Sequence, residues 1–107
     1  MAQFFNTPCT AGEIVKLIQS SDDKLILISP YIKFDKKYDD LLRNRDDRKL
    51  STTIIYGKEQ ELQDSVTNLI QNTKYIDIKF YKDLHAKCYA NSSKIIITSL
   101  NLYDFSI

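Results

Sequence analysis

Two short, uninterrupted apolar runs constrain the fold of this chain more than any other feature. Residues 25–28 (LILI) and 52–56 (TTIIY) each have the length of a single strand and carry no charged side chain. Such runs are typical of strands that are buried on both faces, as in a parallel sheet. Two parallel strands need a crossover connection, usually a helix. An α/β fold is therefore expected.

Helical patterns lie around and between these runs. Thr10 and Glu13 have the spacing of a capping box and begin the first predicted helix. Residues 35–45 form a charged second helix, and residues 62–70 carry the clearest 3.6-residue periodicity in the chain. The predicted inward residues are Ile14, Val15, Leu17 and Ile18, then Tyr38, Leu41 and Leu42, then Leu62, Val66, Leu69 and Ile70.

Further strands are expected toward the C-terminus. Residues 75–80 alternate strictly between apolar and polar side chains, which predicts a strand with one wet face. Residues 84–90 and 94–98 are joined by Asn-Ser-Ser at 91–93, so they should pair antiparallel. We predict one α/β domain over residues 1–107, with a mixed, mainly parallel sheet flanked by helices on both faces. A C-terminal β-hairpin would carry the site.

Composition places the chain among ordinary globular proteins. Its 107 residues are 43% hydrophobic and 27% charged, and the net charge of +1 gives no overall field toward nucleic acid or acidic lipid. Cys9 and Cys88 lack metal-ligand spacing, and no apolar run approaches the roughly 18 residues that span a bilayer. With no secretory leader, we expect free thiols, a cytoplasmic location and no membrane association. Residues 43–49 are interpreted as a solvated helix end.

The candidate site begins in the predicted strand 84–90. Side chains alternate along a strand, so His85, Lys87 and Tyr89 are expected on one face of the sheet. This arrangement sets an imidazole beside an ammonium group. The opposite, packed face would carry Ala86, Cys88 and Ala90.

The predicted hairpin brings a second polar group to the same place. A turn at 91–93 puts Lys94 beside Ala90. Ser99 then falls close to His85, with Asn101 just beyond it. Imidazole, ammonium, hydroxyl and amide together suit a phosphate, because they supply a nucleophile, a fixed positive charge and neutral donors. A slip of one residue would reverse the face of each side chain.

Each of these residues also has a purely structural interpretation. A single histidine beside a strand is often a half-buried, hydrogen-bonded residue. Lys87 alone fits a solvated face, and Ser99 with Asn101 fits a turn or a helix cap. Only the combination at hairpin-compatible spacing indicates a site.

The combination resembles a known signature. His85-x-Lys87 followed by Thr98-Ser99-x-Asn101 is similar to the His-x-Lys-x4-Asp-x6-Gly-Ser-x-Asn pattern of the phospholipase D-like superfamily. Residues 28–32 (ISPYI) and 96–103 (IITSLNLY) are similar to single-motif bacterial members of nuclease type. The resemblance covers nearly the whole chain and implies a phospholipase D-like fold.

The chain also departs from that pattern. The interval is one residue shorter, the motif Asp falls on Asn91 or Ser92, and Thr98 replaces the motif Gly. Family members carry a further acidic residue that orients the histidine, and this chain stops at Ile107 before that position. We expect a truncated or degenerate member, or a fragment. An imidazole without its carboxylate loses tautomer control, which predicts weak activity.

The resemblance implies a mechanism and a partner. His85 would attack a phosphodiester and form a phosphohistidine, while Lys87 and Asn101 hold the nonbridging oxygens and Ser99 and Thr98 bind substrate. A second histidine must protonate the leaving oxygen, and the chain has one, so the active form would be a homodimer. No metal or other cofactor is expected.

Nucleic acid is the favoured substrate because no interfacial amphipathic surface for lipid stands out. Little sequence specificity is expected. One alternative is an inactive phospholipase D-like module that binds nucleic acid, or merely dimerises, inside a larger restriction or helicase-type protein. Another is an α/β core with no phosphate-related function.

Overall fold

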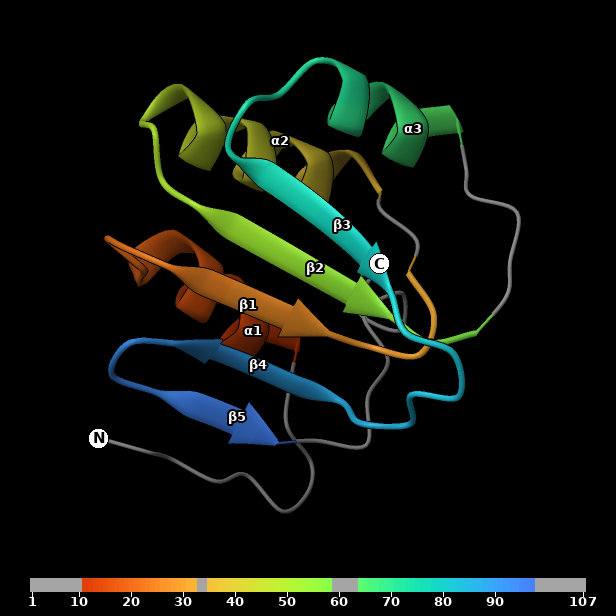
Figure 1. The fold of residues 1–107 in the computed structure, drawn as a ribbon. Helices are drawn as coiled ribbons and strands as arrows, with labels where there is room; N and C mark the ends of the chain where they lie inside the picture. Colours follow the sequence, from red (N-terminus) through yellow and green to blue (C-terminus); the bar gives the residue numbers. More distant parts are fainter. Residues whose placement is uncertain (1–10, 33–34, 59–63, 98–107) are drawn as a thin grey trace.

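The computed structural model describes residues 11–32, 35–58 and 64–97, and in this part of the chain five strands form one sheet (Figure 1). The strand order is β3-β2-β1-β4-β5. β1, β2 and β3 are parallel, whereas β4 is antiparallel to both β1 and β5. The predicted mixed sheet is confirmed, with two parallel and two antiparallel strand pairs among the described residues. The strands are β1 (Leu25–Ile28), β2 (Thr52–Tyr56), β3 (Ile76–Phe80), β4 (Cys88–Asn91) and β5 (Ile95–Ile97).

The helices of the described residues all lie behind the sheet in Figure 1. They are α1 (Ala11–Ser20), α2 (Lys36–Asp47) and α3 (Asp64–Gln71). The chain steps in one direction across the sheet, from β1 through α2 to β2 and through α3 to β3. Right-handed crossovers in one direction put both helices on the same face. The expected helices on both faces are therefore not seen in the described part of the chain.

One-sided coverage explains the burial pattern of the strands. The row of side chains that faces the helices runs across all five strands, and its central members Ile54, Leu27, Tyr89 and Ile96 are at most 1% exposed. Ile26, on the other face of β1, is 39% exposed. The prediction that residues 25–28 are buried on both faces is thus wrong. The wet face predicted for residues 75–80 is confirmed, because Asp77 and Lys79 are exposed.

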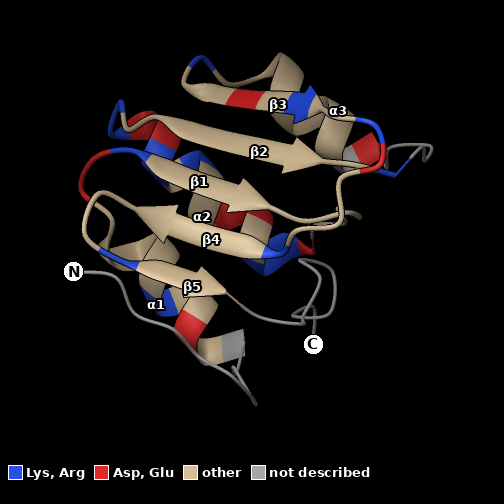
Figure 2. Ribbon diagram, turned by 60° about the horizontal axis from the view of Figure 1, so that its bottom comes forward, with Lys and Arg blue, Asp and Glu red and all other residues tan. Residues whose placement is uncertain are grey.

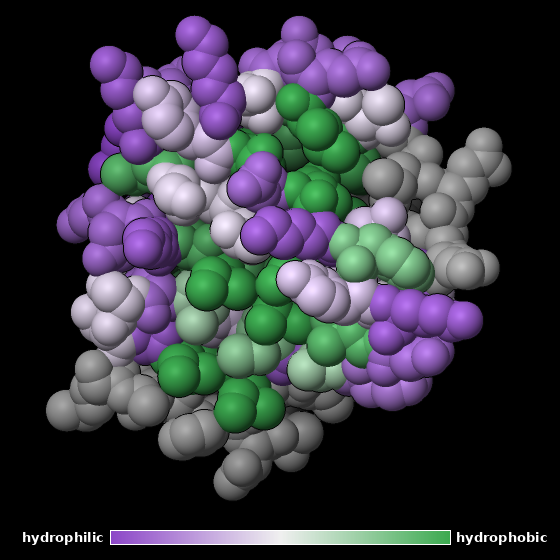
Figure 3. All heavy atoms as spheres, viewed as in Figure 1, coloured by the Kyte–Doolittle hydropathy of each residue, from purple (hydrophilic) through white to green (hydrophobic). Residues whose placement is uncertain are grey.

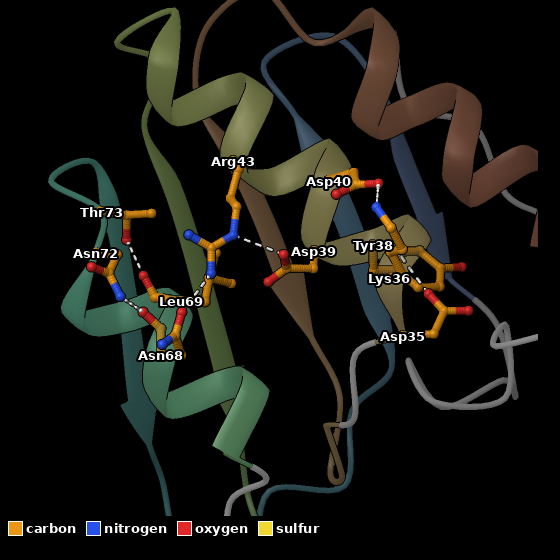
Figure 4. A network of polar contacts seen from close by, with 10 residues as sticks. All are labelled: Asp35, Lys36, Tyr38, Asp39, Asp40, Arg43, Asn68, Leu69, Asn72 and Thr73. Carbon is orange, nitrogen blue, oxygen red and sulfur yellow. Dashed lines mark hydrogen bonds and ion pairs between the residues drawn. The ribbon is translucent and has the colours of Figure 1, made fainter.

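Side-chain hydrogen bonds join α2 to α3. Arg43 donates through Nε to Asp39 Oδ2 (2.7 Å) and through a terminal nitrogen to Asn68 Oδ1 (2.9 Å) (Figure 4). Asp35 caps α2 by accepting from the Tyr38 backbone N–H (3.0 Å). Tyr38 and Leu42 face the core, as predicted. Burial raises the pKa of the Tyr38 hydroxyl above its usual range.

A buried guanidinium holds the amino edge of the sheet together. Arg45 of α2 is 1% exposed and donates to Thr52 Oγ1 (2.8 Å). It also donates to three backbone carbonyls, those of Ser21, Asp23 and Ser51. Burial lowers the pKa of Arg45. The interpretation of residues 43–49 as a solvated helix end is therefore wrong at Arg45.

None of the helices in the described residues is long and apolar enough to cross a membrane.

Candidate functional site

His85 and Lys87 lie at the carboxyl edge of the parallel strands. β4 runs antiparallel to β1, and Cys88 at its start pairs with Ile28 at the end of β1. The residues just before β4 therefore lie beside the loops that follow β1, β2 and β3 (Figure 1). Open α/β sheets bind ligands outside this edge.

A tight turn after β3 leads the chain to His85. Tyr81 N–H donates to the Tyr56 carbonyl (2.9 Å), and Asp83 N–H donates to the Gly57 carbonyl (3.1 Å). Asp83 adopts a left-handed conformation with φ of 64°, which aspartate tolerates better than most residues. These bonds fasten the turn to the end of β2. The position of the backbone just before His85 thus depends on β2.

Gly57 is required for this close approach. A Cβ at position 57 would contact Leu84, with 2.6 Å to its carbonyl oxygen and 2.7 Å to its Cα. Backbone atoms cannot move aside as a flexible side chain can. We expect Gly57→Ala to lower the free energy of unfolding by about 1–3 kcal/mol, measured by urea denaturation.

The matched control is the same substitution in a helix. Gly12 is exposed in α1, where alanine is the better helix former, so Gly12→Ala should leave stability unchanged or raise it by up to about 1 kcal/mol. Equal stability of the two variants would contradict the packing argument at Gly57.

The structure corrects the expected strand around His85. β4 begins at Cys88, so His85 and Lys87 precede the strand instead of lying within it. His85 is exposed and Lys87 is half-buried, and neither makes a hydrogen bond or ion pair within the described residues. Tyr89 is 0% exposed and packs beneath the helices, whereas Ala86 is exposed. The predicted assignment of the two faces is therefore wrong.

The hairpin β4–β5 is confirmed, but its register is one residue away from the prediction. Ala90 pairs with Ile95, not with Lys94. The turn is shorter than predicted because Asn91 joins β4, and its backbone N–H donates to the Lys94 carbonyl (3.0 Å). Asn91 Oδ1 also accepts from the backbone N–H groups of Ser93 and Lys94, both at 2.8 Å. The remaining predicted site residues, Thr98, Ser99 and Asn101, lie outside the described residues.

Asn91 makes a further contact, with the residue that follows α1. Its Nδ2 donates to Ser21 Oγ (2.9 Å), and that hydroxyl donates to the Leu17 carbonyl. The hairpin is thereby tied to the end of α1. An ionised aspartate at this position would have no donor for Ser21, so this contact depends on the amide.

Positive side chains accompany His85 at the carboxyl edge. Lys58 follows β2, Lys82 follows β3 and Lys87 precedes β4. The loop after β1 is held to that of β2, because the Pro30 carbonyl accepts from the N–H groups of Gly57 (3.1 Å) and Lys58 (3.0 Å). Lys82 and Lys87 belong to the same loop between β3 and β4, so three ammonium groups lie on two neighbouring loops, which favours an anionic ligand.

Other features of the described residues lie away from this edge or lack the chemistry of a site. Cys88 is a half-buried free cysteine, and burial raises the pKa of its thiol, which disfavours the reactive thiolate. A groove of about 540 Å³ lies between α1 and α2, and neither His85 nor Lys87 lines it. Within the described part of the chain, no group of three or more His, Cys, Asp or Glu side chains is placed to hold a metal ion.

Comparison of the sequence with protein-family models and with curated proteins gives no match.

Proposed function

We propose that this chain is a phosphodiesterase of phospholipase D-like type that cleaves the backbone of nucleic acid. The observation that carries the proposal is that His85 and Lys87, one residue apart, lie at the carboxyl edge of a mixed sheet just before β4. Lys82 on the same loop and Lys58 on the neighbouring loop after β2 add positive charge for a phosphate. His85 is exposed and can reach a polymeric substrate.

The proposed reaction is a double displacement at phosphorus. An imidazole nitrogen of His85 attacks the phosphorus, a P–N bond forms, and the P–O bond to the leaving oxygen breaks. A second histidine gives its proton to that oxygen and then takes one from water. The activated water attacks the phosphohistidine and releases the phosphate and His85. Lys87, with Asn101, holds the nonbridging oxygens as charge builds up.

The reaction needs two imidazoles, and the chain has a single histidine. Attack requires a neutral imidazole, while the leaving oxygen requires a protonated one. A twofold axis that brings two copies of His85 together supplies both. The proposed active form is therefore a homodimer.

A nuclease assay in EDTA tests this proposal. We expect labelled single- or double-stranded DNA to be cut at the same rate with and without EDTA, because the ammonium and amide donors replace a metal in the charge stabilisation. Raising the salt concentration should slow the reaction, since phosphate contacts dominate binding. Strict dependence on Mg²⁺ would contradict the mechanism. Cleavage of phosphatidylcholine vesicles but not of DNA would change the substrate class.

One observation favours the non-enzymatic alternative. Within the described residues no carboxylate bonds to His85, and an orienting carboxylate raises the basicity of a catalytic imidazole. A module that only binds nucleic acid predicts retained DNA affinity and no cleavage under any of these conditions.

A further inference from the structure

The face of the sheet opposite the helices carries two complete rows of side chains. The strand registers place one outward residue of each strand in each row. From β3 to β5, the first row is Asp77, Thr53, Ile26, Ala90 and Ile95, and the second is Lys79, Ile55, Ile28, Cys88 and Ile97.

The part of this face over β1, β4 and β5 is apolar. Its outward residues are all uncharged, and Ile26 and Ile97 are 39% and 47% exposed. Hydrophobic spheres run across the middle and lower part of this face in Figure 3. A contiguous apolar surface of this kind marks an interaction site more often than a free surface.

The charged residues of this face gather on β3. Asp77 and Lys79 are both exposed and lie two residues apart, one in each row (Figure 2). The face therefore ends, at one side, in one negative and one positive group. When a second copy is rotated by 180°, the negative group of each copy can face the positive group of the other.

We propose that a second copy of this chain packs on this face, sheet against sheet, about a twofold axis that runs across the strands between the two rows. This axis sets each first-row residue opposite the second-row residue of the same strand. Asp77 then meets Lys79 of the partner subunit at two symmetric places, and the isoleucines of β1 and β5 face one another. Facing sheets lie about 10 Å apart, which lets these side chains interdigitate.

A twofold axis along the strands is disfavoured by charge. A twofold axis along the strands would set β3 of one copy against β5 of the other. Asp77 and Lys79 would then be buried against Ile95 and Ile97 of the partner without a counter-charge, which is costly. The charge pattern thus favours the twofold axis across the strands over the axis along them.

This interface is separate from the pairing of histidines in the proposed function. The axis across the strands reverses their direction, so the two carboxyl edges lie at opposite ends of the assembly. His85 and Lys87 of both copies stay uncovered. Each edge remains available for the other contact, so failure of one proposal leaves the other standing.

Analytical ultracentrifugation of matched variants tests the interface. Ile26→Glu puts a charge in the middle of the face and should abolish this dimer. Lys79→Glu and Asp77→Lys each set like charges opposite one another, and each should weaken dimerisation by about tenfold or more. Lys37→Glu, the same charge change on an exposed position of α2, should have no effect. Circular dichroism checks that each variant is folded.

Mixing the two charge variants provides the sharpest test. A Lys79→Glu copy paired with an Asp77→Lys copy restores both cross-subunit ion pairs, so the mixture should form heterodimers at least about tenfold more tightly than either variant alone forms homodimers. A chain that sediments as a monomer at about 50 μM, an Ile26→Glu variant whose assembly has the same mass as that of the wild type, or a mixture without heterodimers would each overturn the proposal.

Discussion

Arg45→Met is expected to lower the free energy of unfolding by about 2–4 kcal/mol. The guanidinium is 1% exposed and donates to Thr52 Oγ1 and to three backbone carbonyls. Methionine fills much of the space but donates no hydrogen bond. The Thr52 hydroxyl and the Ser21 and Asp23 carbonyls therefore lose this donor, while the Ser51 carbonyl keeps the Leu25 N–H. Leaving such groups unsatisfied is the main cost. Urea denaturation followed by circular dichroism measures it.

Arg48→Met is the matched control, since it makes the same substitution just beyond α2. The Arg48 side chain is 48% exposed, and its ion pair with Asp22 spans 3.7 Å. Exposed pairs of this kind contribute little, so a change of less than about 1 kcal/mol is expected. If Arg45→Met were as stable as Arg48→Met, the buried arginine would have no role in joining α2 to the amino edge of the sheet.

His85→Ala is expected to reduce phosphodiester cleavage by a factor on the order of 10⁴ or more while leaving stability unchanged. The proposed mechanism uses this imidazole as nucleophile and, from the second copy, as acid and base, so one substitution removes both functions. The side chain is exposed and packs against no core, so the free energy of unfolding should change by less than about 0.5 kcal/mol. Single-turnover cleavage of labelled DNA measures the rate.

Two further measurements separate chemistry from binding. DNA affinity of His85→Ala should stay within about threefold of wild type, because Lys58, Lys82 and Lys87 still provide the phosphate contacts. Gln71→Ala, at the exposed end of α3, should cut DNA at the wild-type rate. Equal rates for wild type and His85→Ala would refute the proposed role of His85. Binding by both proteins with cleavage by neither would establish the module interpretation.

Local patterns were sufficient to predict the elements of the described part. The apolar run at 25–28, the alternation at 75–80 and the periodicity of α3 each depend on neighbours a few residues away, and the structure has a strand or helix at each of them. The turn chemistry after β4 also predicted the hairpin. Its register was missed by one residue, because the Asn91 side chain bonds to the turn and lets Asn91 itself join the ladder.

At Arg45 the helical spacing and the charge of the residue predict opposite degrees of burial. It follows Tyr38 and Leu42 on the inward side of α2, at spacings of four and three residues, so its position alone predicts burial. Its charge favoured the solvated interpretation instead. Four acceptors converge on that side chain from segments far apart in sequence, and the sequence does not reveal such convergence.

The sequence by itself determined the class of the fold, the order of its strands and helices, and the residue types available for phosphate chemistry. Tertiary structure alone decided three other properties: which face of the sheet the helices cover, where β4 begins relative to His85, and which outward residues line up across five strands. The physical reason is that periodicity records whether a side chain is buried, whereas crossover handedness and strand register determine what buries it.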